Sequence, residues 1–159
     1  MSASPIVELE DLATQISPGT RLMGLDLGSK TIGIALSDIG QLIATPLKTV
    51  QRSKFTKDAE HLVQLTSSED VCAIVLGLPL NMDGSEGPRA QATRAFARNL
   101  DGHTKLPIVL WDERLSTVAV ERTLMEADSS RKRRSEVVDK MAAAYILQGA
   151  LDRLANLRG

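Results

Sequence analysis

The sequence contains little that would bind a soft metal or form a covalent cross-link. Its 159 residues include one cysteine and two histidines. A single cysteine allows no disulfide within the chain, which fits a reducing compartment. The histidines, His61 and His103, are far apart in sequence and belong to no metal-ligand motif. The sequence therefore excludes the disulfide-stabilised class and offers no zinc motif.

Long apolar runs are also missing. No apolar stretch approaches the roughly 20 residues that a membrane-spanning helix needs. The N-terminus lacks the basic segment followed by an apolar one that marks a signal peptide. We therefore expect a soluble, cytoplasmic protein.

Neither an excess of positive charge nor many aromatic side chains are present. The net charge is −1, from 19 basic and 20 acidic residues. With two Phe, one Tyr and one Trp, extensive base stacking is excluded. A nucleic acid would have to be bound through its backbone and shape, at a local basic patch. The best candidate is a run of four consecutive cations, Arg131, Lys132, Arg133 and Arg134.

What is present is an ordinary globular composition, with 43% hydrophobic and 25% charged residues. The length is that of one domain. Residues 6–16 have helical spacing, which Ser17-Pro18-Gly19 interrupts. We therefore predict an N-terminal extension and linker over residues 1–20 and a single domain over residues 21–159.

Hydrophobic patterning predicts three strands joined by short turns, followed by alternating helices and strands. The first three strands are expected at 22–27, 31–37 and 42–50, as antiparallel hairpins. Pro46 places the third at an edge or a bulge. Further strands are expected at 71–77 and 107–112, and helices at 56–66, 89–100, 117–127 and 135–157, with a basic loop at 128–134. This order predicts an α/β domain with a mixed five-stranded sheet, and sites at the carboxyl ends of its strands.

Asp26 stands inside the apolar strand 22–27, on the same face as Gly24 and Gly28. A buried carboxylate needs a cation, a metal or several hydrogen-bond donors. The small neighbours leave room for such a partner, although an Asp satisfied by loop amides would have the same pattern. We favour a functional role.

Asp112 and Glu113 end the apolar strand 107–112. Adjacent strand residues point to opposite faces, so at most one of the two can share a site with Asp26. Acidic residues are common at strand ends, and Asp112 can equally orient Arg114 or cap the next turn.

Asp139 lies four residues before Ala143, on the apolar stripe of the last helix. We place it near the first turn of that helix, where the dipole favours an anion. That preference explains its position along the helix but not its face, which is directed toward the sheet. Three converging carboxylates without a histidine or cysteine cluster suit Mg²⁺ or Mn²⁺. Such sites support phosphoryl transfer, with two ions roughly 3.5–4 Å apart.

Four segments in order then resemble one family: GLDLGSKTIGIA at 24–35, VLGLPLNMDGSE at 75–86, DERLST at 112–117, and Asp139 with the Ala-rich helix after it. They resemble the YqgF family. Its members are similar to Holliday junction resolvases and are described as pre-16S rRNA nucleases. The resemblance covers roughly residues 21–157.

This resemblance implies a ribonuclease H-like fold and a cytoplasmic hydrolase that matures the 5′ end of 16S rRNA with Mg²⁺ or Mn²⁺. It implies catalytic and metal-binding roles for Asp26, Glu113 and Asp139. The implied partners are nucleic acid and the pre-ribosomal particle, with the protein a monomer or weak homodimer. Thr31 departs from the family pattern, since many members have Arg there.

Several charged residues near these motifs are secondary candidates. Lys30, Arg114 and the basic run 131–134 are predicted to contact nucleic acid, and Asp83 is a reserve metal ligand. Lys30 and Arg114 are equally typical of a solvated surface, and Asp83 of an ordinary surface loop. A basic run is usually a solvated loop, but this one leads directly into the helix that carries Asp139, which favours a functional role.

Three alternative functions fit parts of this pattern. A four-way-junction DNA resolvase would use the same site. A non-catalytic rRNA-binding assembly factor would keep the fold without the chemistry. Actin-like kinases and ATPases begin with a similar Asp-x-Gly hairpin, but they need a second domain that this chain is too short to contain.

Overall fold

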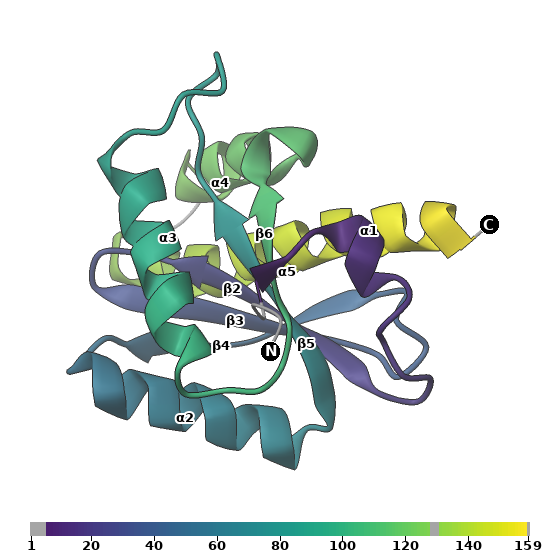
Figure 1. The fold of residues 1–159 in the computed structure, drawn as a ribbon. Helices are drawn as coiled ribbons and strands as arrows, with labels where there is room; N and C mark the ends of the chain where they lie inside the picture. Colours follow the sequence, from purple (N-terminus) through teal and green to yellow (C-terminus); the bar gives the residue numbers. More distant parts are fainter. Residues whose placement is uncertain (1–5, 128–130, 159) are drawn as a thin grey trace.

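A six-stranded mixed sheet forms the centre of the computed structural model, which describes residues 6–127 and 131–158 (Figure 1). The spatial order is β1-β6-β5-β2-β3-β4. β2, β3 and β4 are antiparallel neighbours, whereas β5, β6 and β1 continue the sheet from β2 in parallel. The strands are β1 (Ile6–Val7), β2 (Arg21–Leu27), β3 (Thr31–Ser37), β4 (Ala44–Gln51), β5 (Val71–Leu78) and β6 (Ile108–Asp112).

The predicted α/β class and mixed sheet are confirmed, and the number of strands needs one correction. Five strands were expected, and β1 is a sixth, pairing with β6 through Ile6 opposite Ile108. Two residues are too few for an alternating pattern to reveal a strand. The expectation for Pro46 is confirmed, because β4 is an edge strand and the register shifts where Pro46 faces Ala35.

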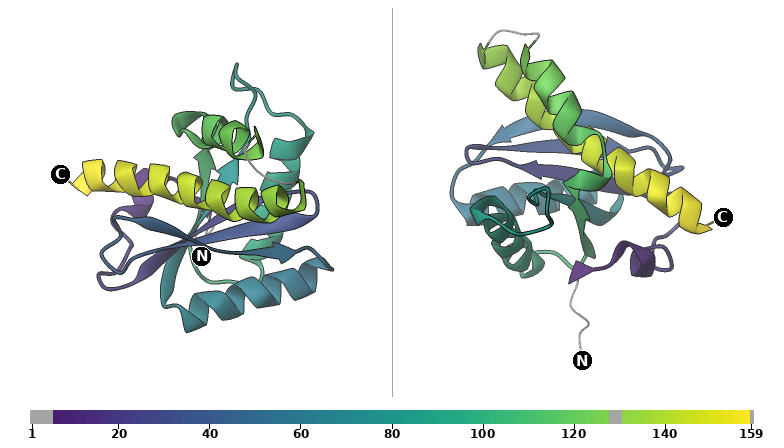
Figure 2. Two further views of the ribbon diagram at one scale, coloured as in Figure 1. Left: turned by 180° about the vertical axis from the view of Figure 1, so that it is seen from behind. Right: turned by 90° about the horizontal axis from the view of Figure 1, so that it is seen from above.

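Helices cover both faces of the sheet (Figures 1 and 2). One core cluster joins the sheet to α2 and α3, and the other joins it to α1, α4 and α5. Alternate residues of β2 divide between them, with Leu22 in one cluster and Met23 in the other, as the pleat requires. The helices are α1 (Leu9–Leu12), α2 (Phe55–Ser68), α3 (Pro88–Asp101), α4 (Val118–Ala127) and α5 (Arg131–Arg158), with a 3₁₀ turn η1 (Glu113–Leu115).

The start of α5 corrects a second expectation. We predicted a basic loop through residue 134, but α5 begins at Arg131, so the basic run is helical. Arginine and lysine have high helix propensity, which their charge does not remove. Residues 128–130 of the predicted loop lie outside the described part of the chain.

Two glycines let α5 lie directly on the sheet. A Cβ at Gly33 would overlap the carbonyl oxygen of Asp139, and a Cβ at Gly24 would lie 2.7 Å from the Cβ of Leu147. Gly33 is also the cross-strand partner of Asp26. The absence of side chains here brings the helix that carries Asp139 beside the strand that carries Asp26.

The described N-terminal residues join the same core. α1 is shorter than the helix predicted over 6–16, because Ile6 and Val7 pair with the exposed edge of β6 instead. Leu12 is fully buried. The division of the chain at residue 20 stays a prediction. Over the residues that the structure describes, no helix combines the length and the apolar character needed to cross a membrane.

Candidate active site

Two of the candidate acids lie at the carboxyl ends of strands: Asp26 is near the end of β2, and Glu113 directly follows β6. A cleft of about 640 Å³ opens beside them, between the β2–β3 turn, α3, α4 and α5. Its charged lining residues are Asp26, Lys30, Arg52, Arg89, Arg122 and Asp139.

Asp26 is only 5% exposed. Burial raises the pKa of its carboxyl above the ordinary value, because a charge is poorly solvated there. The guanidinium of Arg122 opposes this rise, and the negative charge of Asp139 adds to it. Asp26 is therefore a buried carboxylate with both an opposite and a like charge beside it, an arrangement that favours a functional role.

Glu113 is the acidic residue after β6 that shares the environment of Asp26. It is 8% exposed, and the absence of a side chain at Gly77 makes room for it, since a Cβ there would lie 2.8 Å from Glu113 Oε2. Burial raises the pKa of Glu113, and the charge of Asp26 raises it further. The described cleft lining does not include Glu113, which is connected to the cleft through Arg122.

Asp112 has the local role that the sequence left open. Its Oδ1 accepts a hydrogen bond from the backbone N–H of Arg114 at 2.9 Å and caps η1. Its Oδ2 lies 2.7 Å from Arg114 Nη2 in an ion pair. Asp112 is thus satisfied within two residues and makes no described contact with Asp26.

Asp139 faces the sheet, as predicted, and its partner is Thr31. The Thr31 hydroxyl donates to Asp139 Oδ2 at 2.5 Å. The expected first-turn position is wrong, because α5 begins at Arg131, about two turns earlier. The helix dipole therefore contributes little, and Thr31 holds the carboxylate in place.

Arg122 was not found from the sequence, yet it joins two of the three candidate acids. Its Nη2 lies 3.1 Å from Asp26 Oδ1, and its Nη1 lies 3.7 Å from Glu113 Oε1. It comes from α4, one turn after the fully buried Val118. That four-residue spacing on an apolar face is the signal that would have identified it.

The donor set fits a hard divalent cation in type, since all three candidate ligands are carboxylates and one cation, Arg122, already bridges two of them. In the part of the chain that the structure describes, however, no three Asp, Glu, His or Cys residues are placed to hold a metal together. The structure thus does not show the expected convergence of Asp26, Glu113 and Asp139 within metal-bridging distance, and a shared metal site at these residues stays a prediction.

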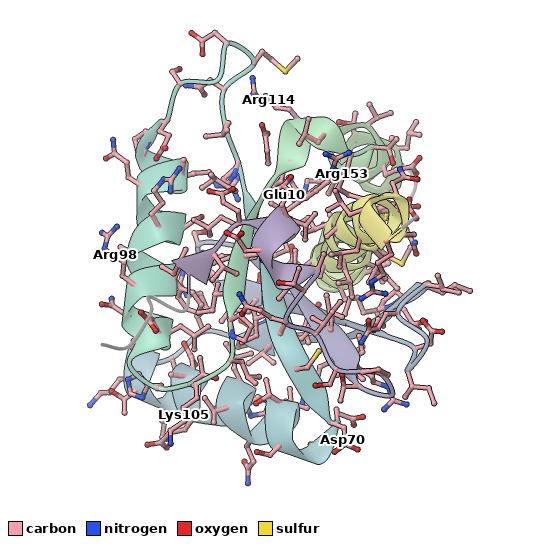
Figure 3. The ribbon with its side chains drawn as sticks, turned by 45° about the vertical axis from the view of Figure 1, so that its right-hand side comes forward. Glu10, Asp70, Arg98, Lys105, Arg114 and Arg153 are labelled. Atoms are coloured by element: carbon pink, nitrogen blue, oxygen red, sulfur yellow. The ribbon has the colours of Figure 1, made fainter. Side chains whose placement is uncertain are left out.

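The secondary candidates separate into two groups. Lys30 lines the cleft. Arg114 does not: besides Asp112, it donates to the carbonyl of Met82 at 3.2 Å, beside the loop after β5 (Figure 3). Asp83 lies in that loop and accepts from the backbone and hydroxyl of Ser85, which lower its pKa. The side chains of Arg131, Lys132, Arg133 and Arg134 lie outside the described part.

Two further arginines line the cleft and were missed. Arg52 Nη1 donates to the carbonyl of Gly28 at 2.7 Å, and Arg89 Nη2 donates to that of Leu27 at 3.5 Å. Both support the turn between β2 and β3. Their positions at a strand end and a helix start were the available signals, but residues so common at surfaces do not reveal a shared cleft.

Comparison with known proteins identifies the family of this chain. The family model described as "RuvX: Holliday junction resolvase" matches residues 20–153. A protein of Methylocella silvestris is 59% identical over 98% of this chain and 96% of its own length. One of Beijerinckia indica is 62% identical over 95% of this chain and 90% of its own. Both are named "Putative pre-16S rRNA nuclease".

Solved structures show the same fold at low sequence identity. RuvC of T. thermophilus, in complex with a Holliday junction substrate, matches with a TM-score of 0.53 at 12% identity, over 86% of this chain and 96% of its own. The yeast mitochondrial Holliday junction resolvase matches with a TM-score of 0.51 at 14% identity, over 94% and 85%. The predicted ribonuclease H-like fold is confirmed.

Proposed function

Because the chain belongs to the RuvX family, which is also called YqgF, we propose that it is a metal-dependent nuclease that hydrolyses phosphodiester bonds in structured nucleic acid. We propose pre-16S rRNA as its substrate, cut near the 5′ end in the cytoplasm on a pre-ribosomal particle. The names of its relatives support this choice of substrate.

The observation that carries the proposal is the placement of Asp26. A carboxylate that is 5% exposed, with a second acidic residue nearby, is costly to keep charged. Asp26 also lines a cleft that contains four basic residues, where a charged carboxylate could bind a metal ion next to a nucleic acid. Perturbed carboxylates in a cleft are typical of catalytic sites.

The proposed ligands are Asp26, Glu113 and Asp139. Bound Mg²⁺ or Mn²⁺ would lower the pKa of a water nucleophile and stabilise the leaving oxygen. Thr31 orients the Asp139 carboxylate by donating its hydroxyl proton. Lys30, Arg52 and Arg89 place positive charge along the cleft, where backbone phosphates of a nucleic acid would lie.

The test is cleavage of three substrates by the purified protein: single-stranded RNA, a precursor spanning the 5′ end of 16S rRNA, and a four-way DNA junction. We expect cutting of the precursor in Mg²⁺ or Mn²⁺ and none in EDTA. Paired cuts in the DNA junction alone, by a twofold dimer, would favour a resolvase instead. Metal-independent binding of the precursor without any cutting would favour an assembly factor and contradict the proposed nuclease.

A further inference from the structure

Arg122 occupies an unusual position for an ion-pair partner. Its guanidinium spans two carboxylates from different elements, at 3.1 Å from Asp26 and 3.7 Å from Glu113. Its side chain is 22% exposed, and it lines the cleft, whereas both carboxylates are at least nine-tenths buried. The guanidinium thus covers the two acidic side chains on the side of the cleft.

The negative charge of the three candidate acids exceeds the positive charge of the cations that contact them directly. Asp139 is bound by the hydroxyl of Thr31, which carries no charge. Arg89 acts on both Asp26 and Glu113 through its electric field, but its described hydrogen bond goes to the carbonyl of Leu27. Arg122 is therefore the described cation in direct contact with Asp26 and Glu113.

From this geometry we propose that Arg122 is a built-in counter-cation that occupies the place of the divalent ion and must leave the Asp26–Glu113 pair before that ion can bind. This inference rests on the proposed function. A metal ion bound at the same carboxylates would bring a second positive charge against the guanidinium, and this repulsion makes metal and guanidinium compete. In the metal-free protein Arg122 offsets part of the negative charge of the two acids, and it weakens metal binding by the free energy needed to displace it.

The displaced guanidinium stays in the cleft with Lys30 and Arg89. Arginine presents parallel N–H donors that match two phosphate oxygens as well as a carboxylate. A backbone phosphate in the cleft would offer Arg122 a replacement partner. Binding of metal and of nucleic acid would then favour each other, because each relieves the cost of the other.

The first test measures Mn²⁺ binding to the metal-free protein by calorimetry, without nucleic acid. Arg122→Met keeps an apolar stem and removes the competing charge, and we expect Mn²⁺ to bind roughly 5- to 150-fold more tightly, the usual range for a coupling between sites. Arg94→Met is the matched control, since it removes one positive charge from an exposed ion pair with Glu86. Its affinity for Mn²⁺ should equal that of the wild type.

Thermal melting separates competition from a fixed structural ion pair. If Arg122 leaves when the metal binds, Arg122→Met should lower the melting temperature in EDTA and much less in saturating Mn²⁺. An equal loss under both conditions would overturn the inference. Should Arg122→Met fail to fold without metal, Arg122→Lys replaces it. A single ammonium cannot span both carboxylates with two nitrogens, so its Mn²⁺ affinity should lie between those of wild type and a charge-free site.

A second arm tests the phosphate contact. Binding of a 12-residue oligothymidylate, confirmed to stay intact, is measured by fluorescence anisotropy in EDTA and in Ca²⁺. Arg122→Met should weaken binding in Ca²⁺ and leave it nearly unchanged in EDTA, where the wild-type Arg122 is held by the carboxylates. Equal effects in both buffers would overturn the phosphate contact.

The outcomes distinguish this inference from the proposed function. If wild type, Arg122→Met and Arg94→Met all fail to bind Mn²⁺, the proposed metal site is wrong and this inference falls with it. If all three bind Mn²⁺ with equal affinity, the metal site stands and only the competition by Arg122 is overturned.

Discussion

Two buried aspartates, Asp26 at the end of β2 and Asp58 at the start of α2, obtain their partners in different ways. Both are nearly inaccessible, at 5% and 4% exposed. Asp58 accepts three hydrogen bonds from Ser53, two from its backbone N–H at 3.1 Å and one from its hydroxyl at 2.9 Å. Asp26 is paired with Arg122, which lies 96 positions away in the sequence.

This difference is our reason for assigning Asp58 a structural role and for proposing a functional role for Asp26. Asp58 has neutral donors from a single residue, Ser53, five positions earlier, and these fix the chain that leads into α2. Asp26 has one charged partner, on a cleft wall, and the charge of Asp139 nearby. Burial alone is therefore a poor indicator of function, and the origin of the partner is a better one.

The largest expected effect comes from Asp26→Asn compared with Asp58→Asn. If Asp26 is a metal ligand, its replacement should reduce the cleavage rate by more than roughly 100-fold. That value is the upper end of the range for residues that only hydrogen-bond to a metal ligand. Folding should survive, or improve without metal, because one of several repelling carboxylates is neutralised. Asp58→Asn should cost about 1.5–3 kcal/mol of stability through its charged hydrogen bonds and leave the rate of the folded protein unchanged.

Cleavage assays paired with melting curves in Mg²⁺ and in EDTA decide between these outcomes. An Asp26→Asn protein that melts early but cuts at the wild-type rate when folded would reverse the assignment and remove Asp26 from the site.

Glycines on the two faces of the sheet give the next largest effect. Gly33→Ala places a methyl group against the backbone of Asp139, which should destabilise the protein by about 1–3 kcal/mol and lower activity by moving that carboxylate. Gly102→Ala, after α3 on the face of Asp58, meets only the carbonyl of Asn99 at 3.5 Å, with φ at −72°. It should gain about 0.4–1 kcal/mol. Denaturant unfolding measures both, and equal effects would show that α5 adjusts freely over Gly33.

The pH dependence of stability should have opposite signs for Asp26 and the exposed Asp38. Burial raises the pKa of Asp26, so its ionisation disfavours the folded state, and stability is lost as pH rises from 3.8 through the raised value. The backbone N–H groups of Ile43 and Leu42 lower the pKa of Asp38, so its contribution is lost as pH falls through the lowered value.

Melting temperatures in EDTA across the acidic range should show both trends as differences from wild type. Asp26→Asn should become relatively more stable as pH rises, and Asp38→Asn relatively less stable. Parallel curves for the two variants would mean that the folded state does not raise the pKa of Asp26 relative to that of Asp38.

The smallest expected effect concerns single surface charges. Lys30→Gln removes a cation from the cleft, whereas Lys57→Gln removes one from the exposed side of α2 beside Asp58. Lys30→Gln should reduce the slope of log affinity against log salt by roughly 0.7–0.9 for one lost phosphate contact, and Lys57→Gln should not. Binding of the rRNA precursor at several salt concentrations provides the slopes, and identical values would exclude Lys30 from the interface.

The elements of the fold followed from local patterns to within a few residues. Apolar runs joined by a short turn located β2 and β3, and the 3.6-residue period located α2, α3 and α4. The patterns failed where the decisive contact was distant, as at β1, which exists because the edge of β6 is available to pair. The patterns also failed at the start of α5, because a run of charges predicts a solvated loop although Arg and Lys favour helix.

The sequence by itself determined the fold class and identified the acidic residues whose surroundings were too apolar for an ordinary surface role. Asp26 and Asp139 were conspicuous because a carboxylate on an apolar face must have a partner. The tertiary structure alone decided what those partners are. Arg122 reaches Asp26 across 96 positions, and Thr31 reaches Asp139 across 108. Such pairs leave no mark in local periodicity, because they depend on how α4 and α5 lie on the sheet.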